Sequence, residues 1–221
     1  MKAYSLLMAG LMAGVSAGNA ASAGAGDVSI NEIVAKNETS LRTESGFAGL
    51  DWVELHNAGD ADVDVTGWYF GNDPAKSVSK WKRIQGSCIV PAHGYRIVWC
   101  DGDGLCGSWA AGEAHVDCNI STEAGKHTLF IANAADPGSI IQQVPMPCGF
   151  EDVSYGRGQD SDEFFYFPTP TPGSANVTAA KKGVTPAVSF SERHGYKTAP
   201  FQLSLSCADA SAPIYYTLNG A

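Results

Sequence analysis

The segment Asp51-Trp52-Val53-Glu54-Leu55-His56-Asn57 decides the fold class of this chain. Apolar and polar residues alternate along it, as they do in a β-strand with one buried face, and the turn residues Asn57-Ala58-Gly59-Asp60 end it. An earlier segment, Val28-Ser29-Ile30-Asn31-Glu32-Ile33-Val34, shows the same alternation. Both segments therefore predict β-strands, and Trp52 is expected to be a large buried anchor.

Segments of this kind recur at short intervals, with turn residues between them and without a long helical periodicity. Many short strands predict an all-β fold, either a sandwich or a barrel. An α/β fold would need helical crossovers between its strands, and the chain has no room for them. The further strand candidates are residues 62–65, 67–70, 81–84, 95–100, 127–131 and 140–144.

The first 23 residues are expected to be a secretory signal peptide rather than part of the fold. Lys2 supplies a positive charge, residues 6–15 form an apolar stretch, and Ala21-Ser22-Ala23 offers a small-x-small cleavage site. The apolar stretch is shorter than the roughly 20 residues that a membrane-spanning helix needs. We therefore expect a secreted or cell-surface protein whose mature part has no membrane span.

A stretch rich in Pro and Gly, residues 169–176, marks the end of the main domain, because prolines do not continue a sheet ladder. We expect the main β domain to span residues 24–176 and a linker to span residues 177–185. Residues 186–221 carry further strand signals, but two or three strands do not bury a core of their own. This last part is therefore expected to be the start of a second, truncated β domain in a longer protein.

The formal net charge of −9 limits the classes of partner. It argues against nucleic-acid phosphates and anionic lipids, because like charges repel. It also fits an exported protein that carboxylates keep soluble. Acidity alone names no ligand.

The sequence has six cysteines, and five of them fall in the main domain. In an exported protein, disulfides are the first expectation. Zinc is the alternative, but the chain lacks a Cys-x-x-Cys pair, the close ligand spacing of many structural zinc sites. We expect at least two disulfides in the main domain, with Cys100 or Cys106 bridged to Cys118, while the full connectivity stays open. The candidates are Cys88, Cys100, Cys106, Cys118 and Cys148, and one of these five is left over or pairs with Cys207.

Three motifs in order resemble the opening of the lamin tail domain, as found in bacterial exported proteins: Ile30-Asn31-Glu32-Ile33, residues 51–57, and Gly67-Trp68-Tyr69-Phe70. Residues 152–157 and 168–176 resemble the last strand and the exit of that family. The resemblance implies an immunoglobulin-like β-sandwich and transfers no catalytic residues. In nuclear lamins this domain serves partner binding, whereas the role of the bacterial versions is mostly unknown.

Residues 186–221 are similar to the small β-sandwich repeat at the C-terminal end of chitobiases and β-hexosaminidases. Residues 186–190, 195–196 and 214–220 carry the likeness. That repeat lies outside the catalytic domain of those enzymes, so it implies no glycoside hydrolysis here. A lamin tail domain followed by such a repeat often precedes a spore-coat-kinase-like (CotH-type) domain. An alternative function is therefore an accessory region of a longer exported enzyme, kinase-like or hydrolytic, whose catalytic domain lies beyond residue 221.

The sequence carries no local catalytic signature. It lacks Gly-x-Ser-x-Gly, His-Glu-x-x-His and a phosphate-binding glycine loop, and its five histidines are scattered singly. Glu32 and Glu54 lie inside strong strand motifs, and we expect them to pair with arginine or to cap a turn rather than to form a glycosidase pair. Residues 101–104 and 160–163 are acidic loops that would suit calcium, but Asp and Gly are also ordinary turn residues. We therefore expect no cofactor.

These observations predict a non-catalytic binding or scaffolding module, with protein and carbohydrate ligands both open. Trp81, Trp99, Trp109 and residues 164–167 supply the aromatic side chains that a sugar ring would contact. Trp99 lies in an alternating strand and is expected in the core. Trp109 lies in a Gly- and Ala-rich loop and is our candidate anchor for a partner. The alternative is that Trp109 folds back over the sheet edge.

Overall fold

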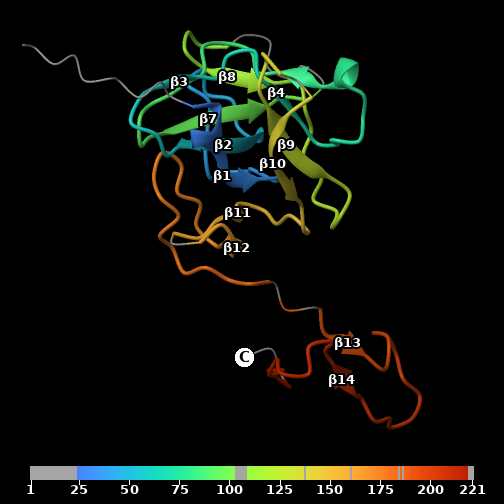
Figure 1. Ribbon diagram of the computed structural model, residues 1–221. Coiled ribbons are helices and arrows are strands. Elements are labelled where there is room, and N and C mark those ends of the chain that lie inside the picture. The colour runs from blue at the N-terminus through green and yellow to red at the C-terminus, as the bar shows by residue number, and fades with distance from the viewer. Residues whose placement is uncertain are drawn as a thin grey trace, which may run out of the picture.

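Two packed β-sheets form the main domain, and a short β-ribbon follows it (Figure 1). The computed structural model describes residues 24–102, 109–136, 138–159, 161–183, 185 and 187–218. The expected signal peptide, residues 1–23, lies outside them. Because the two sheets enclose one apolar core, the main domain is an immunoglobulin-like β-sandwich, and the predicted fold class is confirmed.

The larger sheet has the spatial order β12-β11-β1-β2-β7-β8. Neighbouring strands are antiparallel, apart from β7 and β8, which run parallel. The pairing of β11 with β1 joins the two ends of the domain in one sheet. The strands are β1 (Val28–Val34), β2 (Asp51–Asn57), β7 (Tyr95–Cys100), β8 (Ala114–Val116), β11 (Ser154–Arg157) and β12 (Phe164–Phe167).

The smaller sheet has the order β10-β9-β4-β5, and all of its pairs are antiparallel. A separate two-stranded pair, β3 with β6, lies at one end of the sandwich. Two short 3-10 helices, η1 (Ala25–Asp27) and η2 (Val78–Lys80), complete the described part of the domain. The strands are β3 (Val63–Asp64), β4 (Tyr69–Gly71), β5 (Lys82–Arg83), β6 (Ile89–Val90), β9 (Thr128–Ala132) and β10 (Ile140–Pro145).

A bulge in β1 sets which side chains face the core. The register with β2 shifts between Ile30 and Glu32, so Ile30 and Ile33 both reach the core although they are three residues apart. Glu32 and Val34 then lie on the outer face of the larger sheet, where Val34 packs with Trp52. Both faces of β1 are therefore buried, although its sequence predicted a strand with one wet face.

A second apolar cluster covers the outer face of the larger sheet. Trp52, Trp99, Val34 and Leu50 form it, and Trp52 is 0% exposed. The prediction that Trp52 is buried is thus confirmed. Trp99 is also buried, but it belongs to this outer cluster and not to the core between the sheets.

The segment after the sandwich ends in a two-stranded ribbon, β13 (Ser189–Phe190) with β14 (Leu205–Ser206). Figure 1 shows the ribbon set apart from the sandwich. Several of its large apolar side chains face solvent, including Tyr215 and Leu218. No helix in the described ranges is long and apolar enough to cross a membrane.

Candidate functional site

Two carboxylates lie side by side on the outer face of the larger sheet. Glu32 in β1 and Glu54 in β2 are cross-strand partners, and both are 0% exposed. Opposite positions on neighbouring strands bring side chains to within roughly 5 Å at Cβ. An adjacent pair of carboxyl groups is the arrangement that could support acid–base chemistry, so its surroundings decide its role.

The exit segment that follows β12 closes over this pair. The backbone N–H of Thr171 donates to both carboxylate oxygens of Glu32 at 3.1 Å, and the Ser154 hydroxyl donates to one of them at 2.5 Å. Glu54 accepts the backbone N–H of Gly173 and the side-chain amide of Asn31, the latter at 2.8 Å. The carboxylates therefore satisfy backbone donors of a turn, which is one of the two roles expected for them. In the part of the chain that the structure describes, neither forms an ion pair with arginine.

Asn176 fixes the end of the same exit segment. Its side-chain amide donates to the backbone carbonyls of Asn31 at 3.1 Å and of Arg157 at 2.9 Å, and its oxygen accepts the Thr171 hydroxyl at 3.1 Å. Residues 168–176 are thus tied to β1, β2 and β11 by buried polar contacts. We call Glu32, Glu54, Asn176 and their hydrogen-bond partners the exit clamp.

Burial shifts the acidity of the exit clamp. It raises the pKa of Glu54 to about 7, although hydrogen bonds from Gly173 and Asn31 act in the opposite direction. Burial also raises the pKa of Glu32, against the hydrogen bonds from Ser154 and Thr171. A raised pKa in a cleft often marks a catalytic acid, and Glu54 is among the residues that border a hollow of about 300 Å³, with Tyr95 and Arg96. Both carboxyl groups are nevertheless 0% exposed, and their oxygens are engaged by donors of the exit segment and of its neighbouring strands.

The candidate anchor Trp109 lies against the sandwich. Its indole stacks on the His115 ring, with centroids 4.2 Å apart and planes inclined by 16°, and it packs on the outer cluster with Trp52 and Trp99. His115 Nδ1 lies 3.2 Å from the buried carboxylate of Asp101. Trp109 is half-buried, so it follows the geometry of the alternative in which it folds back onto the sheet. Whether it also binds a partner stays a prediction.

The cysteines do not show the expected bridges. Cys88, Cys100, Cys118 and Cys148 are free thiols in the structure, and Cys106 lies outside the described residues. Burial raises the pKa of Cys88 and Cys118 to about 12 and that of Cys100 well above its ordinary value. Cys100 and Cys118 both lie in the core between the sheets, where burial keeps both thiols protonated at neutral pH. The disulfides remain a prediction.

The acidic loops gather no metal site among the described residues. Asp103, Gly104 and Asp160 lie outside those residues, so each loop is only partly seen. In the described ranges, no three His, Cys, Asp or Glu side chains come together where they could hold a metal ion. Asp162 instead pairs with Arg157 at 3.6 Å.

A hollow of about 190 Å³ lies on the smaller sheet, over Phe130 and beside the segment that carries η2. We call it the lysine–tryptophan hollow. Trp81 is one of the aromatic candidates predicted from the sequence, whereas the lysines around it were not predicted. The available signal was three lysines within seven residues of an otherwise acidic chain. Its lining includes Asn72, Lys76, Lys80, Trp81, Lys82 and Asn119.

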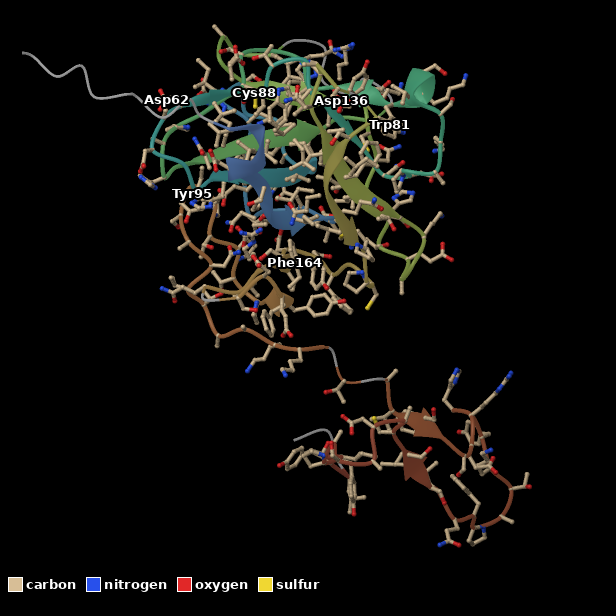
Figure 2. All side chains as sticks on the ribbon, in the orientation of Figure 1. Asp62, Trp81, Cys88, Tyr95, Asp136 and Phe164 are labelled. Atoms are coloured by element: carbon tan, nitrogen blue, oxygen red, sulfur yellow. The ribbon has the colours of Figure 1, made fainter. Side chains whose placement is uncertain are left out.

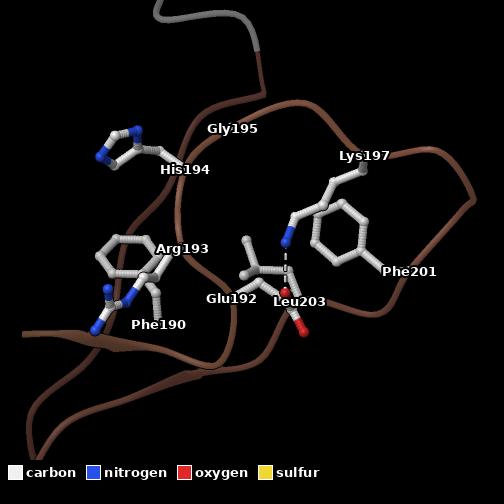
Figure 3. Close-up of a pocket in the computed structure, with 8 residues that line it drawn as sticks. All are labelled: Phe190, Glu192, Arg193, His194, Gly195, Lys197, Phe201 and Leu203. Carbon is white, nitrogen blue, oxygen red and sulfur yellow. Dashed lines mark hydrogen bonds and ion pairs between the residues drawn. The ribbon is translucent and has the colours of Figure 1, made fainter.

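A larger hollow, about 560 Å³, lies in the ribbon (Figure 3). Phe190, Phe201 and Leu203 form its apolar wall, and Lys197 bridges it by an ion pair with Glu192 at 2.6 Å. A two-stranded ribbon is a single layer of sheet. Its apolar side chains therefore border open space where a larger domain would have a second sheet. We interpret this hollow as the uncovered side of the ribbon rather than as a ligand site.

The fold, with its two-sheet sandwich and its buried exit clamp, defines an immunoglobulin-like module. The family model of the lamin tail domain matches residues 21–144, more than half of the chain. The chain therefore belongs to the lamin tail domain family. No curated protein and no solved structure matches it.

The family match ends before the sandwich does. It stops within β10, whereas β11 and β12 complete the larger sheet and the exit segment closes the clamp. The likeness of residues 186–221 to the chitobiase repeat finds no support in these comparisons.

Proposed function

We propose that this chain is a non-catalytic binding or scaffolding module of a secreted or cell-surface protein. The observation that carries the proposal is the exit clamp. Its carboxylates have the raised pKa of potential catalytic acids, yet they are fully buried and hydrogen-bonded to the backbone of the exit segment. These contacts support a structural role for the two carboxyl groups in closing the domain, and they favour recognition at the surface over catalysis by this pair.

The extracytoplasmic location rests on two features of the sequence. Residues 1–23 have the three parts of a signal peptide, and six cysteines are many for a protein of a reducing compartment. Expression through an export pathway, followed by N-terminal sequencing, tests the first feature. Cleavage after Ala23 is the expected result, and a retained Met1 in the exported chain would contradict it.

Mass mapping of the same non-reduced, exported protein tests the disulfides. We expect Cys118 in a peptide linked to Cys100 or Cys106, because these residues close a short loop. Such a bridge contributes about 3 kcal/mol for a loop of about 15 residues. If all five cysteines of the main domain alkylate freely, the expected disulfides do not exist.

A binding screen with a parallel turnover assay tests the function itself. The mature chain, residues 24–221, is screened against envelope polysaccharides and surface proteins, and each bound ligand is then checked for chemical change. We expect saturable binding without turnover. Glu54→Gln is the control variant, because it keeps the size of the side chain and removes its acidity. Turnover that this variant abolishes while the fold persists would make the chain an enzyme and overturn the proposal.

A further inference from the structure

The lysine–tryptophan hollow has an aromatic wall built from both strands and loop. Trp81 packs on Phe130 with ring centroids 4.5 Å apart, and its edge meets Tyr69 at 6.0 Å. The Arg83 guanidinium covers the Tyr69 ring at 4.3 Å and donates a hydrogen bond to the backbone carbonyl of Gly67. Trp81 is therefore held in place by its neighbours and stays half-exposed on the outer face of the smaller sheet, where Figure 2 labels it.

Three ammonium groups border this wall. Lys82 pairs with Asp117, and Lys76 lies 3.8 Å from Asp73. Lys80 has no ion pair among the described residues, and its side chain is exposed. Asp73 and Asp117 also line the hollow, so three ammonium groups face two carboxylates and one positive charge is in excess, on a chain whose formal net charge is −9. On an acidic protein, a small positively charged patch attracts an anion to the patch, while the rest of the surface repels it.

Planar polar groups complete the lining. The Asn72 side-chain amide donates to the backbone carbonyl of Asn119 at 2.7 Å, which fixes the rim opposite Trp81. Asn119 is exposed, and its side-chain amide packs against Gly102, another residue of the lining. A hollow of about 190 Å³ is smaller than the roughly 300–1,000 Å³ of pockets for drug-sized molecules, so it suits one small ring.

We propose that the lysine–tryptophan hollow binds a carboxylate-bearing sugar unit of an acidic polysaccharide. The pyranose ring lies against Trp81, and its carboxylate lies between Lys76 and Lys80, with amide groups for its hydroxyls. This inference rests on the proposed binding function and names a ligand class for it.

An acidic polysaccharide has a lower charge density than DNA or an anionic membrane, and this difference favours it as the ligand of an acidic protein. Double-stranded DNA carries one charge per about 1.7 Å of its axis, so it would face the acidic remainder of the surface as well as the hollow. An anionic membrane presents the same difficulty over a larger area. An acidic glycan carries at most one carboxylate per sugar, and its neutral faces tolerate the surrounding carboxylates.

The test uses a trimer of galacturonic acid as the probe and its fully methyl-esterified form as the matched neutral probe. Both are titrated into the mature chain by calorimetry at 50 mM and 150 mM salt. We expect the acid to bind at least about tenfold more tightly than the ester, and its affinity to fall at the higher salt concentration. Equal binding of the two probes, or no binding of the acid, overturns the inference.

Matched variants locate the site. Lys76→Ala/Lys80→Ala removes two charges at the hollow, and Lys36→Ala/Lys182→Ala removes two exposed charges elsewhere. We expect the first variant to lose about tenfold in affinity for the acid and the second to lose less than about twofold. All four positions are exposed, so unfolding curves should coincide with that of the parent chain. If the two variants bind alike, the hollow is not the site.

Two further results separate the inference from the proposed function. If inorganic phosphate, a short DNA duplex or anionic vesicles compete with the trimer at equal charge concentration, the hollow is a general anion site and the sugar assignment falls. If the screen finds another ligand whose binding is unchanged in Lys76→Ala/Lys80→Ala, the binding function stands and only the inference fails. If the screen and the trimer both give no binding, both fail.

Discussion

The sandwich and the ribbon contain the same kinds of large apolar residue, but the sandwich buries these side chains and the ribbon exposes them. In the sandwich, Trp52 and Phe130 are 0% exposed, although each lies on an outer face of its sheet. In the ribbon, Tyr215 is 89% and Leu218 is 94% exposed. Strand-forming residues are present in both regions. The difference is that the sandwich supplies a covering segment for each face, while among the described residues the ribbon has neither a second sheet nor a cover.

The exit clamp shows what such a cover requires. The exit segment is polar and rich in proline, so it has little apolar surface to bury. It is held instead by hydrogen bonds that its backbone donates to Glu32 and Glu54 and that its own Asn176 donates to the backbone of β1 and β11. Glu32, Glu54 and Asn176 are all buried. Each donor thereby keeps a partner, whereas leaving such a buried polar group unpaired would cost about 1–3 kcal/mol. Burying two carboxylates is therefore the means by which a segment without a hydrophobic face becomes part of the domain.

Hydrogen exchange should show the largest contrast between the two regions. Amides of β2 and β7 are expected to exchange at least about 10³-fold more slowly than those of β13 and β14, because central strands open only with the whole domain. Mass spectrometry of peptides from the mature chain measures both regions in one sample. If the amides of β13 and β14 are as protected as those of β2, the ribbon is covered, and the contrast with the sandwich is wrong.

Removing one carboxylate of the exit clamp should have the next largest effect. Glu54→Ala leaves the Asn31 amide and the Gly173 N–H without their acceptor and opens a small cavity. We expect a loss of about 3 kcal/mol in the free energy of unfolding, since unpaired buried donors and cavities each cost 1–3 kcal/mol or more. Urea unfolding followed by tryptophan fluorescence measures it.

Two controls define the cause of that loss. Glu151→Ala removes an exposed carboxylate that pairs with Lys36, and it should change stability by less than about 0.5 kcal/mol. Glu54→Gln keeps an acceptor oxygen and should lose less than Glu54→Ala. If all three variants are equally stable, the exit segment does not depend on the clamp.

Much of the fold could be predicted from local pattern. β1, β2 and β7 have the predicted bounds, and the valines of residues 62–65 face inward while the aspartates face solvent. The strands that were missed, β6, β8 and β12, are short or lack alternation. β8 is a strand because it pairs in parallel with β7, and its own three residues do not indicate that pairing.

The candidate site was less predictable, because it depends on distant contacts. Glu32 and Glu54 could be singled out within their strands, but the donors from Thr171 and Gly173 come from a segment more than 100 residues away. The bulge that places Glu32 on the outer face also cannot be predicted from the alternation of apolar and polar residues. The lysine–tryptophan hollow needs residues from β4, β5 and the segment after β8 at once.

The pH dependence of stability should come from the sandwich. Burial raises the pKa of Glu54 from 4.5 to about 7 and that of Asp51 from 3.8 to about 7. The folded state therefore holds protons that the unfolded state has released, so stability falls as the pH rises from about 4 to about 7. Asp152 acts in the opposite sense at lower pH. Burial opposes its ionisation, but hydrogen bonds from Thr39 and its neighbours lower its pKa to about 2, and their contribution is lost as the pH falls from 3.8 towards 2.

Unfolding midpoints in urea between pH 3 and pH 8 measure both slopes. We expect maximum stability between about pH 4 and pH 5, and a shallower decline towards pH 7 in Glu54→Gln, which has no proton to lose there. Hydrogen exchange at two pH values assigns the effect to a region, because both raised carboxylates belong to the sandwich. A stability that rises from pH 4 to pH 7 would contradict the assigned cause.

Trp109 gives the smallest expected effect and tests where the sandwich ends. Its ring stacks on His115 and covers the outer cluster, so Trp109→Ala should lower the free energy of unfolding by about 1 kcal/mol. His115→Ala removes the other ring of the stack, and the double variant should lose less than the sum of the two single losses, because they share one contact. A partner anchor would behave differently. Trp109→Ala would then cost about 2 kcal/mol of binding to a ligand found in the screen and leave unfolding nearly unchanged. The changes in the free energies of unfolding and of ligand binding are both measured on Trp109→Ala. A loss of stability means that the indole covers the sheet, as Trp52 does. A loss of binding alone means that it is an exposed contact for a partner, as uncovered as the side chains of the ribbon.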